Sequence, residues 1–164
     1  MHEIRPYKLS ISTHEIEDLN RRLAHTRLPD QAPGEQWKTG TDLEWFKKLL
    51  NYWKLNYDWK KSESELNQFP QFKTKISGID LHFIHFHGKA KKNIPLLLMH
   101  GWPGSIVEFL HIIDQLAHPE KFGGKEEDSF DVIVPSLPGY GFSGRPSRPI
   151  GPRIMASIFN SLMT

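Results

Sequence analysis

The stretch Pro95-Leu96-Leu97-Leu98-Met99-His100-Gly101-Trp102-Pro103-Gly104-Ser105 decides the fold. Its first five residues are bulky and uncharged, which is typical of a fully buried parallel strand. After Ser105, apolar residues recur at helical spacing, and Ser105 with Glu108 makes an S-x-x-E capping box that predicts a helix start. The six residues from His100 onward are therefore predicted to form a turn between a strand and a helix.

This turn combines two glycines with the start of a helix. Gly101 and Gly104 let the backbone approach a ligand closely, and the first N–H groups of a helix have no partner inside it. Such groups stabilise a negative charge that develops on an oxygen atom. We interpret the turn as one side of an oxyanion hole. The alternative is an ordinary connection in an α/β sheet.

Composition excludes several classes of protein. The chain has 164 residues, enough for one domain with a core, and its 21 basic and 19 acidic residues leave a net charge of +2, which gives no push toward nucleic acid. The absence of cysteine excludes disulfides, thiolate catalysis and Cys-ligated zinc. We see no signal peptide, membrane anchor or membrane span, which favours a soluble or cytoplasmic location. The oligomeric state stays open.

Residues 1–70 are predicted to be a helical region that begins with an extended arm at 1–11. The pairs Ser12–Glu15 and Thr41–Glu44 predict two helix starts, and a third short helix is expected over 59–67. Four of the five tryptophans lie in this region: Trp37, Trp45, Trp53 and Trp59. They could form a ligand cage, but the favoured interpretation is packing onto something larger, because so thin a segment cannot bury its own aromatic rings.

Residues 71–164 are predicted to form the α/β part of the chain. After Pro70, apolar and polar residues alternate on both sides of Gly78, which predicts a β-hairpin at a sheet edge. His85 and His87 share one face of its second strand and suggest a metal pair. No third ligand lies nearby in sequence, so we expect no metal site.

A second buried strand is expected at Phe130–Pro135, followed by the long glycine-rich loop 136–149. The loop leaves the same edge of the sheet as the turn, and ligands in such sheets bind at the carboxyl ends of the strands. Pro152 then begins a final helix.

At this point the sequence resembles a known family. H-G-W-P-G-S (100–105) together with P-S-L-P-G-Y-G-F-S-G (135–144) resembles the α/β-hydrolase fold and, within it, the epoxide hydrolases. Three further segments resemble the N-terminal region of microsomal-type epoxide hydrolases: 57–61, 66–72 and 78–83. The resemblance implies an α/β architecture, with a helical N-terminal segment packed on a truncated α/β-hydrolase sheet.

The resemblance also implies a two-step mechanism without cofactor or metal. An aspartate opens a small apolar epoxide while two lid tyrosines protonate the leaving oxygen, and a histidine oriented by an acidic residue activates water to hydrolyse the alkyl-enzyme ester. Two backbone N–H groups hold the oxyanion, one of which maps onto Trp102. The rest of the oxyanion turn is His100, Gly101, Pro103 and Gly104. The resemblance further implies that the Trp102–Pro103 bond is cis. It also implies that the side chains of Trp102, Tyr140 and Phe142 line the substrate pocket.

The nucleophile, the base and the lid tyrosines are expected to lie outside this chain. The family's G-G-D-W-G turn is absent, none of the nine histidines matches the base, and Tyr140 is not a lid tyrosine. We therefore expect the N-terminal portion of an epoxide hydrolase of detoxification or aromatic catabolism, inactive alone, with the particular epoxide left open. The alternatives are a piece of an esterase or dehalogenase, or a non-catalytic binding protein.

Overall fold

The computed structural model describes residues 3–164, and the chain separates into two compact units. One unit is Leu9–Leu66, and the other is Asn67–Thr164 together with the segment up to Lys8. The predicted domain division at residue 70 stays a prediction. By packing, the chain changes unit after Leu66, and its first strand belongs with the later residues.

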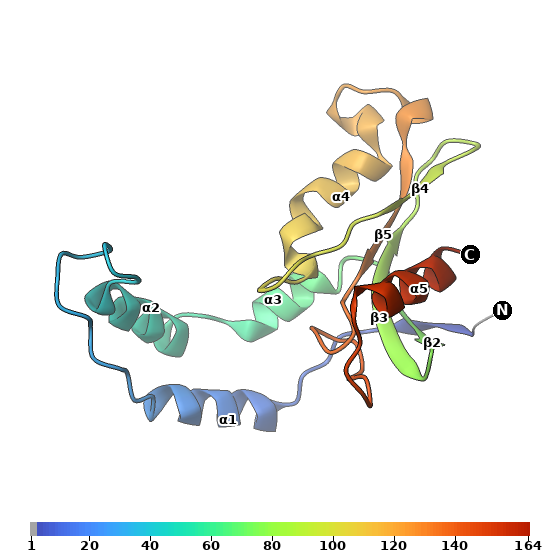
Figure 1. The fold of residues 1–164 in the computed structure, drawn as a ribbon. Coiled ribbons are helices and arrows are strands. Elements are labelled where there is room, and N and C mark those ends of the chain that lie inside the picture. Colours follow the sequence, from blue (N-terminus) through green and yellow to red (C-terminus); the bar gives the residue numbers. More distant parts are fainter. Residues whose placement is uncertain (1–2) are drawn as a thin grey trace. The chain divides into compact units, whose positions relative to one another are not determined.

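The larger unit is built on a five-stranded mixed sheet (Figure 1). Its order is β1-β2-β3-β5-β4, with β4 parallel to β5 and the other pairs antiparallel. The strands are β1 (Ile4–Tyr7), β2 (Gln71–Ile76), β3 (Ile79–Phe86), β4 (Ile94–Leu97) and β5 (Phe130–Pro135). The predicted parallel pair is therefore present, and part of the predicted extended arm is an edge strand.

Two predictions about the edges of the sheet were wrong. The β2–β3 hairpin is internal, because β1 covers β2 and β5 covers β3. Leu81 and Ile84 point to opposite faces of β3 and are both fully buried, which is the burial of an inner strand. The strand at 95–99 is shorter than predicted and is not fully buried: β4 has one neighbour among the described residues, and Ile94 is 65% exposed.

Two helices cover opposite faces of the sheet (Figure 1). The 3₁₀ turn η1 (Ile106–Phe109) leads into α4 (Leu110–Ala117), and the capping box at its start is confirmed. On the other face lies α5 (Pro152–Met163), which packs on β2 and β3. The main apolar cluster of this unit is Ile76, Ile79, Leu81, Ile158 and Phe159. The connection between α4 and β5 contains two further 3₁₀ turns, η2 (Pro119–Phe122) and η3 (Glu126–Asp128).

The smaller unit contains three helices. They are α1 (Thr13–Ala24), α2 (Leu43–Leu55) and α3 (Trp59–Leu66). The capping box of Ser12 with Glu15 is confirmed. The predicted cap at Thr41 was wrong by one residue: the Asp42 carboxylate accepts the Trp45 N–H at 2.8 Å, and Asp42 is buried.

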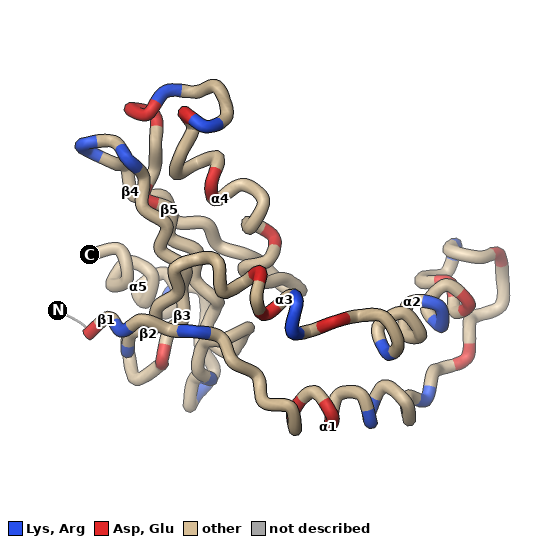
Figure 2. Tube along the Cα trace, turned by 180° about the vertical axis from the view of Figure 1, so that it is seen from behind, with Lys and Arg blue, Asp and Glu red and all other residues tan. Residues whose placement is uncertain are grey.

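Aromatic side chains of the helical unit remain prominent at its surface. Trp37 and Trp45 meet edge to face with ring centroids 5.3 Å apart, and they are 55% and 46% exposed. An apolar hollow of about 440 Å³ is lined by Leu19, Leu49, Tyr52, Trp53, Tyr57 and Trp59. The choice between packing surface and ligand cage therefore stays open. Basic and acidic residues are interspersed along both units (Figure 2). None of the helices in residues 3–164 has the length and apolar composition needed to cross a bilayer.

Candidate active site

The turn after β4 lies where the sequence predicted it. The Leu98 N–H donates to the Ile133 carbonyl at 2.9 Å, which extends the strand pairing toward the turn. At the other end, the Ser105 N–H donates to the Glu108 carboxylate at 3.1 Å. A Cβ on Gly104 would collide with that carboxylate and lie 2.9 Å from the Gly101 carbonyl oxygen. Gly104 is therefore required by the close approach of the cap to the turn.

His100 holds the turn to the loop that follows β5. Its side chain is buried, and its Nε2 accepts the Leu137 N–H at 3.1 Å. Since Nε2 is an acceptor, Nδ1 carries the ring proton and donates to the Gly101 carbonyl at 3.0 Å. Both ring nitrogens therefore have hydrogen-bond partners, and the neutral His100 side chain links the turn to the loop. The structure thus brings together the two segments that the sequence predicted at one sheet edge.

The loop after β5 is fastened to the same edge by its backbone. The Ser136 N–H donates to the His82 carbonyl at 2.9 Å, and the Gly144 N–H donates to the Asp80 carbonyl at 2.7 Å. Gly139, at φ +84°, donates to the Gly144 carbonyl at 2.9 Å and closes the loop on itself. A glycine suits this left-handed backbone, since it has no Cβ to clash. The loop is consequently a closed, anchored structure.

Trp102 projects from the turn. Its side chain is 80% exposed, and its peptide bond to Pro103 is cis, as the resemblance implied. The Trp102 N–H donates no hydrogen bond to any residue of the described chain. A backbone donor without an internal acceptor at this edge is available to an external oxygen.

The two aromatic residues of the loop face different neighbours. The Tyr140 ring meets the His100 ring edge to face, with centroids 5.7 Å apart. The Phe142 ring instead lies 5.2 Å from the His82 ring and 6.3 Å from Tyr7. The role of these residues and of Trp102 in lining a pocket stays a prediction.

Sequence reasoning missed a buried polar network beneath the loop. His82 is fully buried; its Nδ1 lies 2.9 Å from Ser136 Oγ and its Nε2 lies 2.9 Å from Gln71 Oε1. Ser143 Oγ accepts the His82 N–H and donates to the Ser136 carbonyl. Burial, followed by the positive charge of Lys73, lowers the pKa of His82 to about 3. The available signal was a histidine in an otherwise apolar stretch, but its partners are 54 and 11 residues away.

The fold and this edge define the class of protein. A parallel strand pair, a turn that enters a helix, and a glycine-rich loop beside that turn form the first part of an α/β hydrolase. Residues 94–162 match the family model described as "alpha/beta hydrolase fold". Residues 4–109 match the family model described as "Epoxide hydrolase N terminus". The chain belongs to the epoxide hydrolase family.

Individual relatives agree with this family. The chain is 44% identical over 145 residues to a putative epoxide hydrolase of Stigmatella aurantiaca, and 44% identical over 151 residues to epoxide hydrolase 1 of Oryctolagus cuniculus. Each match covers 88% of this chain, which spans about a third (33%) of each relative. The solved juvenile hormone epoxide hydrolase of Bombyx mori has a TM-score of 0.84 at 35% identity, over 99% of this chain and 43% of that one.

Proposed function

We propose that this chain supplies one side of the active site of an epoxide hydrolase, an enzyme that converts an epoxide and water to a vicinal diol. The observation that carries this proposal is the Trp102 N–H, which lies at the carboxyl edge of the sheet and has no acceptor among residues 3–164. In the proposed role this N–H donates to the oxyanion formed when water attacks the alkyl-enzyme ester. In this role, the carboxylate nucleophile and the water-activating base come from residues other than those of the oxyanion turn and the loop at 136–149.

The surroundings of Trp102 support a rigid donor. The hydrogen bonds of His100 to Gly101 and Leu137 tie the turn to the loop, and the capping box ties its other end to η1. A donor held in place before the reaction needs no reorganisation as charge develops. Loss of one such donor costs about 2.7–4 kcal/mol of transition-state stabilisation, which is about 10²–10³ in rate.

The proposed substrate is a small apolar epoxide. The exposed Trp102 indole and the half-buried Tyr140 ring present aromatic surface beside the donor. Apolar surface of this kind favours a substrate with little charge. The names of the relatives, epoxide hydrolase and juvenile hormone epoxide hydrolase, support the same substrate class.

The test places this chain in the context of a complete enzyme. A chimera carries residues 1–164 in place of the matched third of the Stigmatella aurantiaca relative, and indole-3-lactic acid replaces Trp102, so that an ester oxygen replaces the N–H. With styrene oxide, we expect the first step to persist and ester hydrolysis to slow by about 10²–10³. The alkyl-enzyme then accumulates in single-turnover mass spectra.

The matched control is Trp102→Phe in the same chimera. It keeps the N–H and removes the indole, so hydrolysis of the ester should stay within about threefold of the parent while KM rises. If the backbone ester at position 102 does not slow hydrolysis of the alkyl-enzyme ester, the proposed donor role of the Trp102 N–H is wrong. If the unmodified chimera is folded but forms no alkyl-enzyme, the epoxide hydrolase proposal is contradicted.

A further inference from the structure

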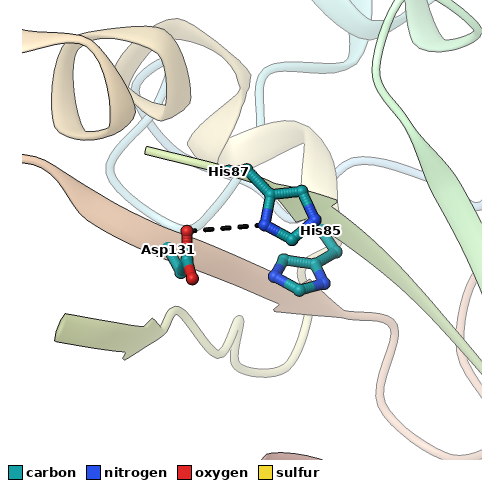
Figure 3. A group of neighbouring side chains, drawn as sticks. All are labelled: His85, His87 and Asp131. Carbon is teal, nitrogen blue, oxygen red and sulfur yellow. Dashed lines mark ion pairs between the residues drawn. The ribbon is translucent and has the colours of Figure 1, made fainter. Parts of the chain in front are cut away.

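Three potential metal ligands meet at the end of β5 away from the loop: His85 in β3, His87 just after β3, and Asp131 in β5 (Figure 3). β3 and β5 are antiparallel, with Phe86 opposite Val132, so the next pair along the same register is His87 opposite Asp131. His85 lies two residues before His87 and therefore on the same face. One possible ligand atom from each of the three residues lies within 4.8 Å of the other two.

The contacts inside this cluster leave it incomplete. His87 Nδ1 lies 3.5 Å from Asp131 Oδ1, and the His85 and His87 rings have centroids 3.9 Å apart. His85 Nε2 is buried and has no hydrogen-bond partner among the described residues. A buried polar atom without a partner is costly, and a coordinated cation would satisfy it.

Neighbouring groups orient the carboxylate. Asp131 Oδ1 accepts the Gly88 N–H at 3.0 Å and the Asn93 side-chain amide at 3.1 Å. Hydrogen bonds of this kind from groups around a site fix metal ligands in place. The Asp131 side chain is 29% exposed and the His87 side chain 65%, so an ion from solvent has access and His87 has room to adjust.

From this juxtaposition we propose that His85, His87 and Asp131 bind a divalent zinc ion. Two imidazole nitrogens and a carboxylate oxygen are ligands that zinc accepts, and a fourth position would remain for water. Ligands on a tetrahedral zinc lie about 3.3 Å apart, so atoms that lie within 4.8 Å of one another need to close by at most about 1.5 Å. A rotation of the exposed His87 side chain provides that movement.

The bound ion has a structural role. Asp131 is near the start of β5 and the glycine-rich loop begins after its end at Pro135, roughly 13 Å along the strand. An ion at this place joins β3 to β5 without touching the oxyanion turn. The inference is independent of the proposed hydrolase function.

The experiment measures Zn²⁺ binding by the complete, tag-free 164-residue chain after treatment with a chelator. Isothermal titration should show one equivalent bound, and saturating Zn²⁺ should raise Tm by about 5 °C. His87→Gln and Asp131→Asn should each weaken binding by at least about tenfold, whereas the exposed His111→Gln should leave it unchanged. Co²⁺ should give the intense visible bands of a tetrahedral complex.

The two variants are chosen so that loss of zinc binding can be distinguished from loss of the fold. Asp131→Asn keeps an oxygen for Gly88, and His87→Gln changes an exposed side chain, so circular dichroism should match that of the parent. If Asp131→Asn does not fold, His87→Gln decides alone. The proposal is overturned if the parent shows no saturable binding up to about 100 µM Zn²⁺, or if His87→Gln binds as tightly as the parent.

Discussion

At the scale of single residues, His82 links the sheet to the loop that carries Tyr140. Gln71 Oε1 can only accept, so His82 Nε2 carries the proton, and Nδ1 accepts the Ser136 hydroxyl. A protonated imidazole would have to donate to Ser136 Oγ instead of accepting from it, and it would place a charge in a fully buried position. The neutral tautomer is therefore part of the folded state.

The depressed pKa of His82 should make the free energy of unfolding depend on pH. The folded pKa of about 3 lies below the ordinary value of 6.5, so between these limits the unfolded chain binds more protons. The free energy of unfolding must then fall as pH falls through that window. For His82 alone we expect a loss of about 2 kcal/mol between pH 7 and pH 5.

Urea unfolding at pH 7 and pH 5 checks this prediction. His82→Gln should lose that part of the pH dependence, whereas the exposed His111→Gln should follow the parent. Should His82→Gln fail to fold, the imidazole NMR signal of His82 in the parent decides. A signal that titrates near pH 6.5 would contradict the assignment of a neutral, buried ring.

At the scale of elements, helix starts depend on one side chain each. Asp42, and not Thr41, caps α2, because its carboxylate oxygen is placed to accept the Trp45 N–H. Both residues fit the composition of an N-cap, and a shift of one position changes which of them reaches the orphan N–H groups. The local pattern therefore locates the helix start to within a residue but not its cap.

A pair of substitutions tests that assignment. Asp42→Ala removes the acceptor and should lower the free energy of unfolding of the helical unit by about 1 kcal/mol. Thr41→Ala, at an exposed position next to it, should change it by less than about 0.5 kcal/mol. Denaturation followed by far-ultraviolet circular dichroism gives both values. The reverse order of effects would restore the Thr41 capping box.

At the scale of the whole molecule, one edge of the described sheet is the apolar strand β4. β4 is bonded to β5 on one side, and among residues 3–164 no strand covers its other side. Beside it a hollow of about 510 Å³ lies between the end of β4 and α5, lined by residues such as Leu97, Met99 and Phe159. Open edges of this kind pair with other chains.

We therefore expect this chain to self-associate through β4. Ile94→Lys places a charge on the edge at a residue that is 65% exposed, and it should weaken association by at least about tenfold. Phe122→Lys, in η2, makes the same change at an exposed apolar site away from the edge and should have little effect. Sedimentation equilibrium measures both. A parent that stays monomeric at about 100 µM would contradict the prediction.

The sequence alone determined the local elements and the family. The turn at 100–105, the loop at 136–149, the helix starts near Ser12 and Ser105, and the strands on both sides of Gly78 all follow from periodicity, glycine and proline placement, and capping residues. These signals act over a few residues along the chain, so they can be recognised in the sequence without knowledge of the fold. The family was indicated by resemblance, carried by 100–105 and 135–144 together with the segments 57–61, 66–72 and 78–83.

Only the tertiary structure decided which strands are edges and which histidines have partners. The positions of β1 and β4 at the two edges, the latch of His100 on Leu137, the network of His82 and the approach of Asp131 to His87 all join residues far apart in sequence. Periodicity assigns a side chain to a face of a strand but not the strand that lies beside it. Pairing between distant strands is set by how the whole chain buries its apolar faces, and that is a property of the folded molecule.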